Sequence, residues 1–576
     1  MNRIYHSIWN RALGAWVAAP ETASAAGQRQ KLPAPGPRAS RSQVKARVLQ
    51  AAWGPLTLAC ALAWPTPGHA VVLNLLVGAG GSGGSGADSG GTGGTGGLGG
   101  GGAGGNSSIN YVTNCIPNGF GPPTCITTPQ TVPGSAGANA SGTSVGNPYT
   151  LTTSATYDSV GVGGGGGGGG GSNIISNPYG GGGAGGLGLL TIASGAELVV
   201  NQLLQVGGDG GQGGTGNSGG AGGAGTLVVE QTGQISIHNG AQLVLGGAAG
   251  TGTGGLGSTG GVGGTGVLNL VGTLAFTGTT SFTIRKNGAL NIGSVTTGAA
   301  TAGTITGLTS IANAGVINFN QADSAHTFRT AITGSGQLVH NAAGTTTLTG
   351  TNSYSGGTTI NGGTLVAANA SALGTGNVTV GQGAALEVSS GTTLAVGADL
   401  TFQPGSTYRV YAQPNGSASS VHASGTATLA GSVLHVGPKS DFAVATPYTI
   451  LTADAGIVAG TRFDAVQSSY AFLTATLGYT SNSVTLTLQG VEDFGRRVNT
   501  PNQQAVVRSV QNLGSSNPVY QHLVQADDSQ AATMANNISG DTHANVRSSL
   551  PSRAAFASDV SLRHLQNNLV AGMRPG

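Results

Sequence analysis

Short runs of alternating apolar and small polar residues fill the chain between residues 187 and 490. Examples are GQLVH at 336–340, TTTLTG at 345–350 and AALEVSS at 384–390, and glycine, asparagine or serine interrupts the runs every few residues. Alternation with a period of two predicts short strands. Because no amphipathic stretch of ten or more residues separates these strands, the crossover helices of an α/β sheet are missing. The pattern predicts an all-β fold, a right-handed parallel β-helix (solenoid) with coils of roughly 20–25 residues.

A longer repeat overlies this pattern between residues 187 and 300. The strand blocks at 187–200, 225–247 and 266–276 recur at intervals of about forty residues and are separated by Gly-rich inserts such as GGDGGQGGTGNSGGAGGAG. We expect each block to form coils of the solenoid and each insert to leave the same side. The VVLNLL run at 71–76 is similar to VLNL at 267–270, so the first coil is expected to begin directly after residue 70.

Composition excludes several classes of protein. The chain of 576 residues contains 109 glycines and only 7% charged residues, so disorder driven by charge is not expected. Residues 1–70 hold eight of the 21 Lys and Arg residues and one of the 18 acidic residues, which leaves a weakly acidic remainder with a net charge of −4. A remainder without a basic stripe argues against nucleic acid as a partner.

The first seventy residues have the features of an export signal. Basic residues between 38 and 47 precede an apolar run at 48–64, and the small-x-Ala sequence ending at Ala70 has the form of a cleavage site. We predict cleavage between Ala70 and Val71. The N-terminal residues Asn2, Tyr5, Trp9, Asn10, Gly14 and Trp16 form a pattern that resembles the extended signal peptide region of autotransporters and two-partner secretion exoproteins. This resemblance implies export through the inner membrane by the Sec machinery.

A second resemblance lies within the strand repeats. The segment Gly334–Ala367, and above all its SYSGGTTINGGTLV portion, resembles the autotransporter-associated β-strand repeat of type V secretion passengers. The resemblance implies a passenger domain that reaches the cell surface or the medium through the outer-membrane assembly machinery or a β-barrel supplied in trans. Without a barrel, we expect the chain to remain in the periplasm.

Two cysteines remain if the signal is removed together with Cys60. Cys115 and Cys125 flank the turn-forming sequence IPNGFGPPT, and the export route leads to an oxidising compartment. We expect a small disulfide loop, with two free thiols as the alternative. The histidines are scattered without ligand spacing, so no metal site and no cofactor is predicted.

Aromatic residues gather near the end of the strand repeats. Between residues 441 and 490 lie Phe442, Tyr448, Phe463, Tyr470, Phe472 and Tyr479, in a chain that is otherwise poor in aromatic side chains. Aromatic area of this size predicts a cap for the open end of the solenoid. The segment resembles the autochaperone end of pertactin-like passengers, which implies that it folds first and templates the coils before it.

After residue 490 the pattern changes to helix. Thr500 and Pro501 have the form of a helix N-cap followed by a first-turn proline, and Ala505, Val506, Val510 and Leu513 lie at helical spacing. Residues 514–550 resemble the helical linker that precedes the β-barrel of autotransporters, with matches at Asn517-Pro518-x-Tyr520 and Ser539-Gly540-x-x-His543-Ala544. The sequence to Gly576 contains no alternating strands for such a barrel, so a truncated, non-functional autotransporter is one expectation.

Catalytic motifs occur only as short strings. The sequence around Ser144 fits a nucleophile elbow and that around Ser218 is similar to a chymotrypsin-like turn, but glycine- and serine-rich sequence produces both by chance. Before Ser218, histidine occurs only at His6 and His69, both within the predicted signal. GDGGQG at 208–213 lacks the βαβ context of a dinucleotide site, and a single calcium-like string at 83–88 has no tandem copy.

These patterns define five segments and one favoured function. The segments are 1–70, the extended signal peptide; 71–186, a Gly-rich region with the small cysteine loop; 187–440, the β-helix; 441–490, the cap; and 491–576, the helical linker. We predict a non-enzymatic adhesin or structural surface protein that contacts an unknown host or bacterial ligand. A passenger protease or esterase is the alternative, although low-complexity sequence stands where a catalytic domain would precede the solenoid.

Overall fold

The computed structural model describes residues 5–10, 15–20, 74–77, 85–86, 105–106, 108–118, 121–132, 143–145, 148–166, 184–213, 218–252, 259–293, 301–412, 417–437, 444–539 and 562–563. The chain divides into two units, Met1–His69 and Ala70–Gly576. In the first unit, β1 (Tyr5–Asn10) and β2 (Ala15–Pro20) form an antiparallel hairpin.

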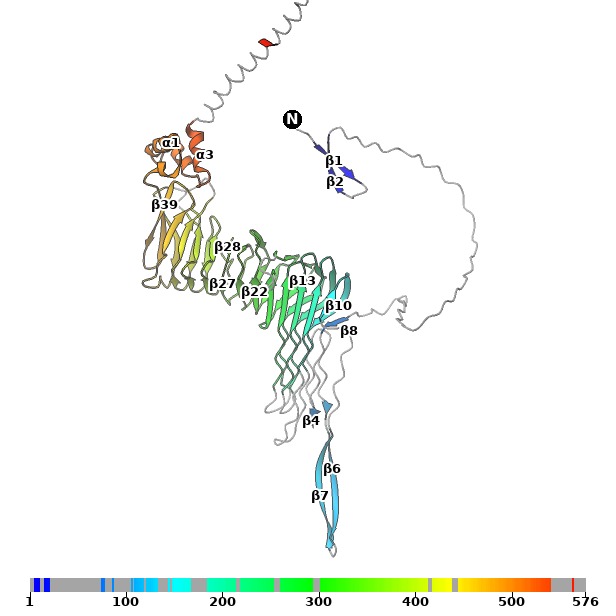
Figure 1. Ribbon diagram of the computed structural model, residues 1–576. Helices are drawn as coiled ribbons and strands as arrows, with labels where there is room; N and C mark the ends of the chain where they lie inside the picture. Colours follow the sequence, from blue (N-terminus) through cyan, green and yellow to red (C-terminus); the bar gives the residue numbers. More distant parts are fainter. Residues whose placement is uncertain are drawn as a thin grey trace, which may run out of the picture. The chain divides into compact units, whose positions relative to one another are not determined.

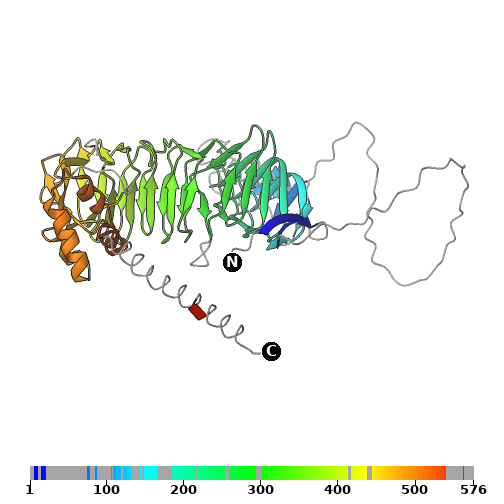
Figure 2. The ribbon, with the colours of Figure 1, turned by 90° about the horizontal axis from the view of Figure 1, so that it is seen from above.

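The second unit is a parallel β-helix, and one long sheet runs through it. Its strands come from successive coils and lie side by side (Figures 1 and 2). They are β9 (Tyr149–Leu151), β11 (Gly188–Ile192), β13 (Gly225–Val229), β16 (Gly266–Leu270), β19 (Gly288–Ile292), β22 (Val316–Phe319), β25 (Gln337–His340), β27 (Thr358–Ile360), β29 (Val378–Val380), β32 (Leu400–Phe402) and β35 (Ala427–Thr428).

A second sheet covers the N-terminal half. Its long strand β12 (Glu197–Val206) pairs with β14 through its first residues and with β15 through its last, and so joins two rows of strands. The other strands are β3 (Asn74–Val77), β8 (Thr143–Val145), β10 (Ala155–Val162), β14 (Gln234–Ile237), β15 (Gln242–Leu245), β17 (Thr273–Phe276), β18 (Ser281–Ile284), β20 (Thr304–Thr306), β21 (Ser310–Asn313) and β24 (Ala331–Thr333).

Two further sheets complete the C-terminal half. The third contains β23 (His326–Phe328), β26 (Thr345–Leu348), β28 (Thr364–Ala367), β30 (Ala385–Val388), β33 (Thr407–Val410), β36 (Ser432–His435) and β38 (Ala465–Ser468). The fourth contains β31 (Thr393–Val396), β34 (Ser420–Ala423), β37 (Pro447–Ala453), β39 (Leu473–Tyr479) and β40 (Ser483–Gly490). Within it β40 pairs antiparallel with β37 and β39, so the parallel stack ends there.

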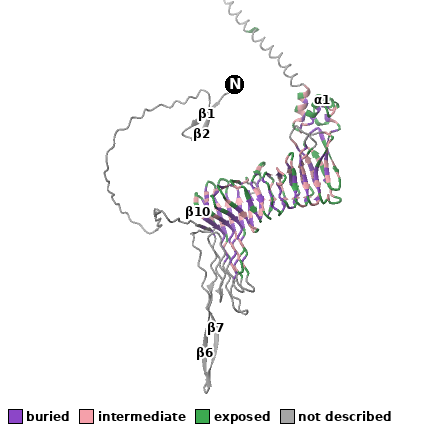
Figure 3. Cartoon of the chain, turned by 180° about the vertical axis from the view of Figure 1, so that it is seen from behind, coloured by how far each residue is buried: buried purple, intermediate pink, exposed green. Residues whose placement is uncertain are grey.

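The core is a set of aligned apolar residues, one from each coil. In the long sheet, Leu190, Leu227, Leu268, Leu290, Ile317 and Leu338 follow one another as register partners, and each is fully buried (Figure 3). Alternate residues of β11, β13 and β16 are buried, as the period of two predicts. The predicted all-β parallel β-helix is confirmed.

Coil length follows the presence or absence of inserts. Register partners are 20 residues apart from Leu338 to Thr358, but 41 residues apart from Gly225 to Gly266. The expected coil length and the longer repeat of about forty residues are therefore both present. The expected boundary at residue 187 falls inside the stack, because β9 and β10 already pair with β11 and β12.

The first coil begins at β3, directly after the predicted signal. The similarity of residues 71–76 to 267–270 does not mark equivalent positions, however. Strand β3 pairs with β10 in the second sheet, whereas β16 lies in the long sheet. A short apolar run shows that a strand forms, but not which face of the coil it occupies.

Buried polar side chains link neighbouring coils. The Asn291 amide accepts a hydrogen bond from Asn318 and donates one to Asn269, both 2.8 Å long. Inside the coil, His340 is fully buried, with Nδ1 2.8 Å from the Gly362 carbonyl and Nε2 3.1 Å from the Thr346 hydroxyl. Burial lowers the pKa of His340, and also that of His326 and His435.

We expect the β-helix to lose stability in mild acid. Burial lowers the pKa of His435 from 6.5 to about 4, so the unfolded chain binds a proton in this range that the folded chain does not bind. Stability is complete above pH 6.5 and falls as the pH drops toward 4, by up to about 3 kcal/mol for this residue. Urea denaturation at pH 7.5 and pH 4.5 measures the loss. His435→Gln should reduce the pH dependence.

Among the described residues, four short helices follow the last strand, β40. They are η1 (Phe494–Arg497), α1 (Pro501–Asn512), α2 (Pro518–Leu523) and α3 (Ala531–Ser539). The predicted cap is present, because the Thr500 hydroxyl accepts from the Gln503 N–H and the Gln503 side chain accepts from the Thr500 N–H. Of the expected apolar face only Val510 is buried, whereas Ala505 and Leu513 are exposed. Val507, which lies outside that face, is buried instead.

Thr500→Ala should destabilise the helical segment by about 1 kcal/mol, because it removes one half of the capping box. Thr500→Ser keeps a hydroxyl at the same position and is the matched control. Hydrogen exchange of the 501–512 amides measures local stability in both variants. Equal protection of the two variants would show that the cap contributes nothing there.

No described helix has both the length and the apolar character needed to span a membrane.

Candidate functional site

Among the described residues, three Gly-rich inserts leave the coils at equivalent points (Figure 1). The first residue of each insert has a positive φ and donates its N–H to the equivalent strand one coil earlier: Gly163 to Val77 (φ 96°, 2.8 Å), Gly207 to Val162 (φ 95°, 2.7 Å) and Gly246 to Val206 (φ 91°, 2.7 Å). A left-handed backbone of this kind favours glycine. The prediction that the inserts leave one side of the coil is therefore correct.

The inserts pack on one another through backbone hydrogen bonds. Within an insert the bonds join antiparallel segments, and in each pair the first residue donates its N–H to the carbonyl of the second. The pairs are Gly208–Gly223, Gly211–Gly220, Gly247–Gly264 and Gly250–Gly261, each 2.8 Å. Between inserts the bonds join parallel segments, and again the first residue of each pair donates its N–H to the carbonyl of the second. The pairs are Gly210–Ala248, Gly213–Thr251, Gly219–Thr259 and Gly222–Val262, at 2.8–2.9 Å. Successive bonds are three residues apart, which is the repeat of a polyproline II chain.

We call this assembly the glycine bundle. Its described residues form three layers: a first layer of 163–166 and 184–187, a middle layer of 207–213 and 218–225, and an outer layer of 246–252 and 259–266. A polyproline II chain has no internal hydrogen bonds, so each segment can bond to several neighbours at once. The inserts are therefore built as a packed structure.

Close packing explains why two of every three residues are glycine. A Cβ on Gly210 would lie 1.9 Å from the Gly261 carbonyl oxygen, and one on Gly219 would lie 1.8 Å from that of Gly211. No side chain fits at such distances. The third position of the triplet carries a side chain, as at Gln212, Ala221 and Val262, and Val262 is 69% exposed.

A single charged residue ties the bundle to the β-helix. The Asp209 Oδ1 atom accepts from Gln205 Nε2 (2.7 Å), from the Ala248 N–H (2.6 Å) and from Arg285 Nη1 (3.1 Å). Arg285 also donates to the Gly246 carbonyl (3.1 Å). Asp209 is the sole charged residue among the described residues of the bundle, so the rest of that surface is uncharged.

The predicted cap residues lie in two aromatic clusters. Phe463 packs against Phe402 (5.3 Å between ring centroids) and Tyr408 (6.2 Å) inside the last coils. Phe472 packs against Phe494 (5.1 Å), which in turn contacts Tyr520 (5.4 Å) of α2. The partners in earlier strands and in the helices were not predicted, because no local pattern connects them to the cap.

The other predicted cap residues are placed as follows. Tyr448 is fully buried, Tyr470 is 4% exposed and lies 5.4 Å from the His435 ring, and the Tyr479 hydroxyl accepts from the Phe463 N–H at 3.2 Å. Phe442 lies outside the described residues. The templating role of this cap stays a prediction.

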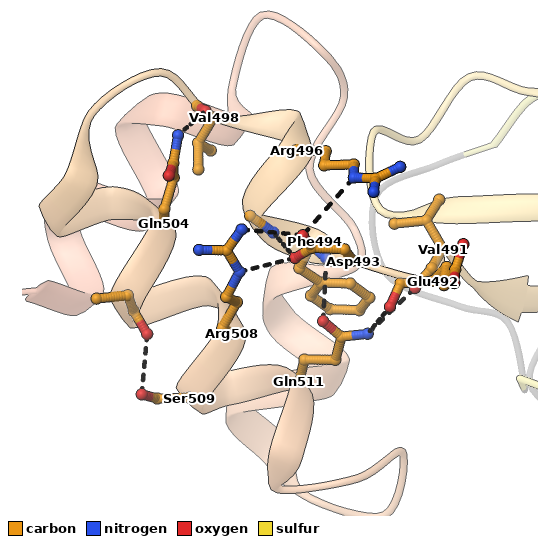
Figure 4. A network of polar contacts seen from close by, with 12 residues as sticks. Val491, Glu492, Asp493, Phe494, Arg496, Val498, Gln504, Arg508, Ser509 and Gln511 are labelled. Carbon is orange, nitrogen blue, oxygen red and sulfur yellow. Dashed lines mark hydrogen bonds and ion pairs between the residues drawn. The ribbon is translucent and has the colours of Figure 1, made fainter.

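A polar network fastens the helices to the end of the last strand (Figure 4). Asp493 accepts two 2.9 Å hydrogen bonds from Arg508 of α1, which hold the pKa of the carboxyl below its usual value. Gln511 accepts from the Phe494 N–H (3.0 Å) and donates to the Val491 and Glu492 carbonyls. The helices therefore extend the cap that the sequence placed at 441–490.

The N-terminal predictions are covered only in part. Strands β6 (Ser108–Asn118) and β7 (Gly121–Val132) form an antiparallel hairpin in which Cys115 stands opposite Cys125. The disulfide itself stays a prediction. Short strands β4 (Ser85–Gly86) and β5 (Gly105–Asn106) pair before it. Ala70 and Val71 lie outside the described residues.

Two groups of described side chains contain a hydroxyl or a histidine of the kind that catalysis uses. The Ser218 hydroxyl bonds to the Thr259 hydroxyl at 2.7 Å. His422 lies 3.0 Å from the Thr452 hydroxyl and 3.3 Å from Asp454, and both His422 and Asp454 are well exposed on the fourth sheet. Within the part of the chain that the structure describes, no three His, Cys, Asp or Glu side chains form a group that could hold a metal ion.

Two family models match the chain. Residues 1–58 match the extended signal peptide of the type V secretion system, and residues 343–367 match the passenger-associated transport repeat. The second match spans β26, β27 and β28, and lies within the segment predicted to resemble a passenger repeat. Both resemblances drawn from the sequence are confirmed.

Two curated relatives are similar over part of the chain. An extracellular serine protease from Serratia marcescens is 29% identical over 268 residues, which cover 41% of this chain and 26% of the relative. The adhesin BmaC autotransporter from Brucella suis biovar 1 (strain 1330) is 37% identical over 89 residues, which cover 16% of this chain and 2% of the relative. The chain thus spans 26% and 2% of the lengths of these two relatives.

Proposed function

We propose that this chain, an autotransporter passenger with an extended signal peptide and a passenger-associated transport repeat, acts by binding, as an adhesin or structural surface protein. The signal peptide and the relatives place it on the route through the inner membrane to surface display or secretion. Its export partners are the Sec machinery and the outer-membrane assembly machinery.

The glycine bundle carries this proposal. It fixes three inserts in one arrangement on one side of the β-helix, and its outward positions hold short uncharged side chains. A surface of this kind supports contact through shape and hydrogen bonds. Its buried glycines lie backbone against backbone. The adhesin relative supports the same function.

A passenger enzyme is the second candidate, favoured by the serine protease relative. Ser218 and the His422–Thr452–Asp454 group are the described side chains that this candidate would use. Ser218 and His422 belong to different parts of the fold, the glycine bundle and the fourth sheet, and the groups around them are exposed.

One replacement tests the binding function. The coil after the outer layer closes with the short turn 285–287, so replacing residues 246–265 by Arg-Lys-Asn removes the outer insert and keeps a turn that this fold already uses. Cells displaying the full chain should adhere to matrix proteins or to other bacteria, and the variant should lose most of that adhesion. Equal adhesion by both chains, or labelling of the full chain by a fluorophosphonate that needs Ser218 or Thr452, would contradict the proposal.

A further inference from the structure

The glycine bundle ends at its outer layer, where the Asn287 side chain bonds to the insert. In the next coil, the short turn 285–287 replaces the insert, and Asn287 stands where a further insert would end. Its Nδ2 donates to the carbonyls of Gly247 (3.0 Å), Gly263 (2.9 Å) and Gly264 (2.6 Å), and its own carbonyl accepts from the Gly266 N–H (3.1 Å). Asn287 therefore bonds to outer-layer carbonyls that a further layer would use, but only where the outer insert joins the coil.

Farther along the insert, the outer layer presents unused donors. In the middle layer, the N–H groups of Gly210 and Gly213 donate to the Ala248 and Thr251 carbonyls of the outer layer. Pairing of Val206 with Leu245 and of Gly213 with Gly252 makes Ala249 and Gly252 the equivalents of these donors. Neither N–H has a partner among the described residues, and both residues are exposed, whereas Gly210 and Gly213 are buried.

We propose that the Ala249–Gly252 edge binds a proline-rich extended segment of a partner protein, in the place that a fourth layer would take. The contact repeats the one between the middle and outer layers, in which one chain donates N–H groups three residues apart to carbonyls of a polyproline II chain. A proline-rich segment adopts that conformation and keeps its carbonyls free. It also brings few N–H groups of its own, and so it suits an edge that offers donors.

Ala249 limits the site to a single chain. In the middle layer, the equivalent residue Gly210 lies against the second segment of the outer layer, residues 259–266. A Cβ on Gly210 would lie 1.9 Å from the Gly261 carbonyl oxygen of that segment. The methyl group of Ala249 closes that second position. One chain can therefore lie above residues 249–252, but a complete two-segment layer cannot form, which keeps the edge from adding glycine-rich inserts without end.

The surroundings of the edge agree with a neutral partner. Residues 246–252 and 259–266 contain no charged side chain, and Val262 and Thr259 are exposed beside it. Binding should therefore be weak for one segment, insensitive to salt, and strengthened by multivalent display on a cell surface. This inference rests on the proposed binding function and names the partner for that surface.

The test uses the purified full chain over a surface densely coated with oligoproline. Wild-type protein should be retained, with little change between low and high salt, and a flexible Gly-Ser peptide coating should retain none. Ala249→Pro removes the N–H and fills the edge, and Gly252→Pro does so independently, yet neither breaks a described hydrogen bond. Each should reduce retention by about tenfold, whereas Ala249→Ser should behave as wild type.

Circular dichroism identifies variants that fail to fold, and the two proline positions provide independent readings. Absence of wild-type retention, retention of both folded proline variants at the wild-type level, or retention only on a surface coated with the chain itself would overturn the proposal. If oligoproline binding is absent while the 246–265 replacement still abolishes cell adhesion, this inference fails and the binding function stands.

Discussion

Replacing Phe472 by alanine should destabilise the C-terminal end of the β-helix by about 3–5 kcal/mol and slow folding of the whole stack. Phe472 is fully buried and lies 5.1 Å from Phe494, which connects the fourth sheet to the helices through Tyr520. The aromatic cluster fills the space between the last strands and α2, so its loss leaves a cavity. Each coil of a solenoid is stabilised mainly by its neighbours, and an uncapped end therefore weakens the coils behind it.

Refolding rates followed by circular dichroism measure this effect. Phe328→Ala is the matched control, because Phe328 is also buried and packs 5.3 Å from Phe319, but lies in the middle of the stack. Both variants should lose stability, and only Phe472→Ala should slow refolding strongly. Similar refolding rates for the two variants would contradict a templating role for the cap.

Gly210→Val should unfold the glycine bundle while leaving the coils intact. Any Cβ at Gly210 meets the Gly261 carbonyl oxygen at 1.9 Å, a backbone atom that cannot move without breaking the hydrogen bond that it accepts from the Gly250 N–H. Overpacking of this kind costs about 1–3 kcal/mol or more, and the bundle has little apolar burial to offset it. Only the inserts should become sensitive to protease.

Ala221→Val is the control for this variant. Ala221 occupies a third position, and the next layer already carries Val262 at the equivalent place, since Gly225 pairs with Gly266. Limited proteolysis with mass spectrometry should locate cleavage within residues 207–225 and 246–266 of Gly210→Val alone. Cleavage at the same rate in both variants, or none in either, would show that glycine is not required there.

The strand pattern was sufficient to predict the β-helix. Alternation in segments such as 337–340 and 345–348 identifies β25 and β26, because a strand with one buried face needs a period of two. Thr500 and Pro501 likewise predict where α1 begins, since capping depends on neighbouring residues. The sequence could not show that β3 and β16 lie in different sheets, because similar apolar runs form strands on different faces of the coil.

The glycine inserts were the main feature that the sequence did not resolve. Their Gly-Gly-x triplets were visible, and a period of three is the signal of a polyproline II chain, but no property of a single insert shows which segments it bonds to. The contacts of Asp209 with Arg285, 76 residues away, and of Phe472 with Phe494 depend on how coils stack. The candidate surface therefore required the three-dimensional arrangement, whereas the fold did not.

Amide hydrogen exchange of the Gly-rich inserts in the full chain tests the central claim most directly. If the inserts form the hydrogen-bonded surface described above, the N–H groups of Gly208, Gly211, Gly247 and Gly250 should exchange far more slowly than in an unfolded peptide. Those of Ala249 and Gly252 should exchange rapidly, because they have no partner among the described residues. Rapid exchange at all six positions would contradict the glycine bundle, and with it the binding surface built on it.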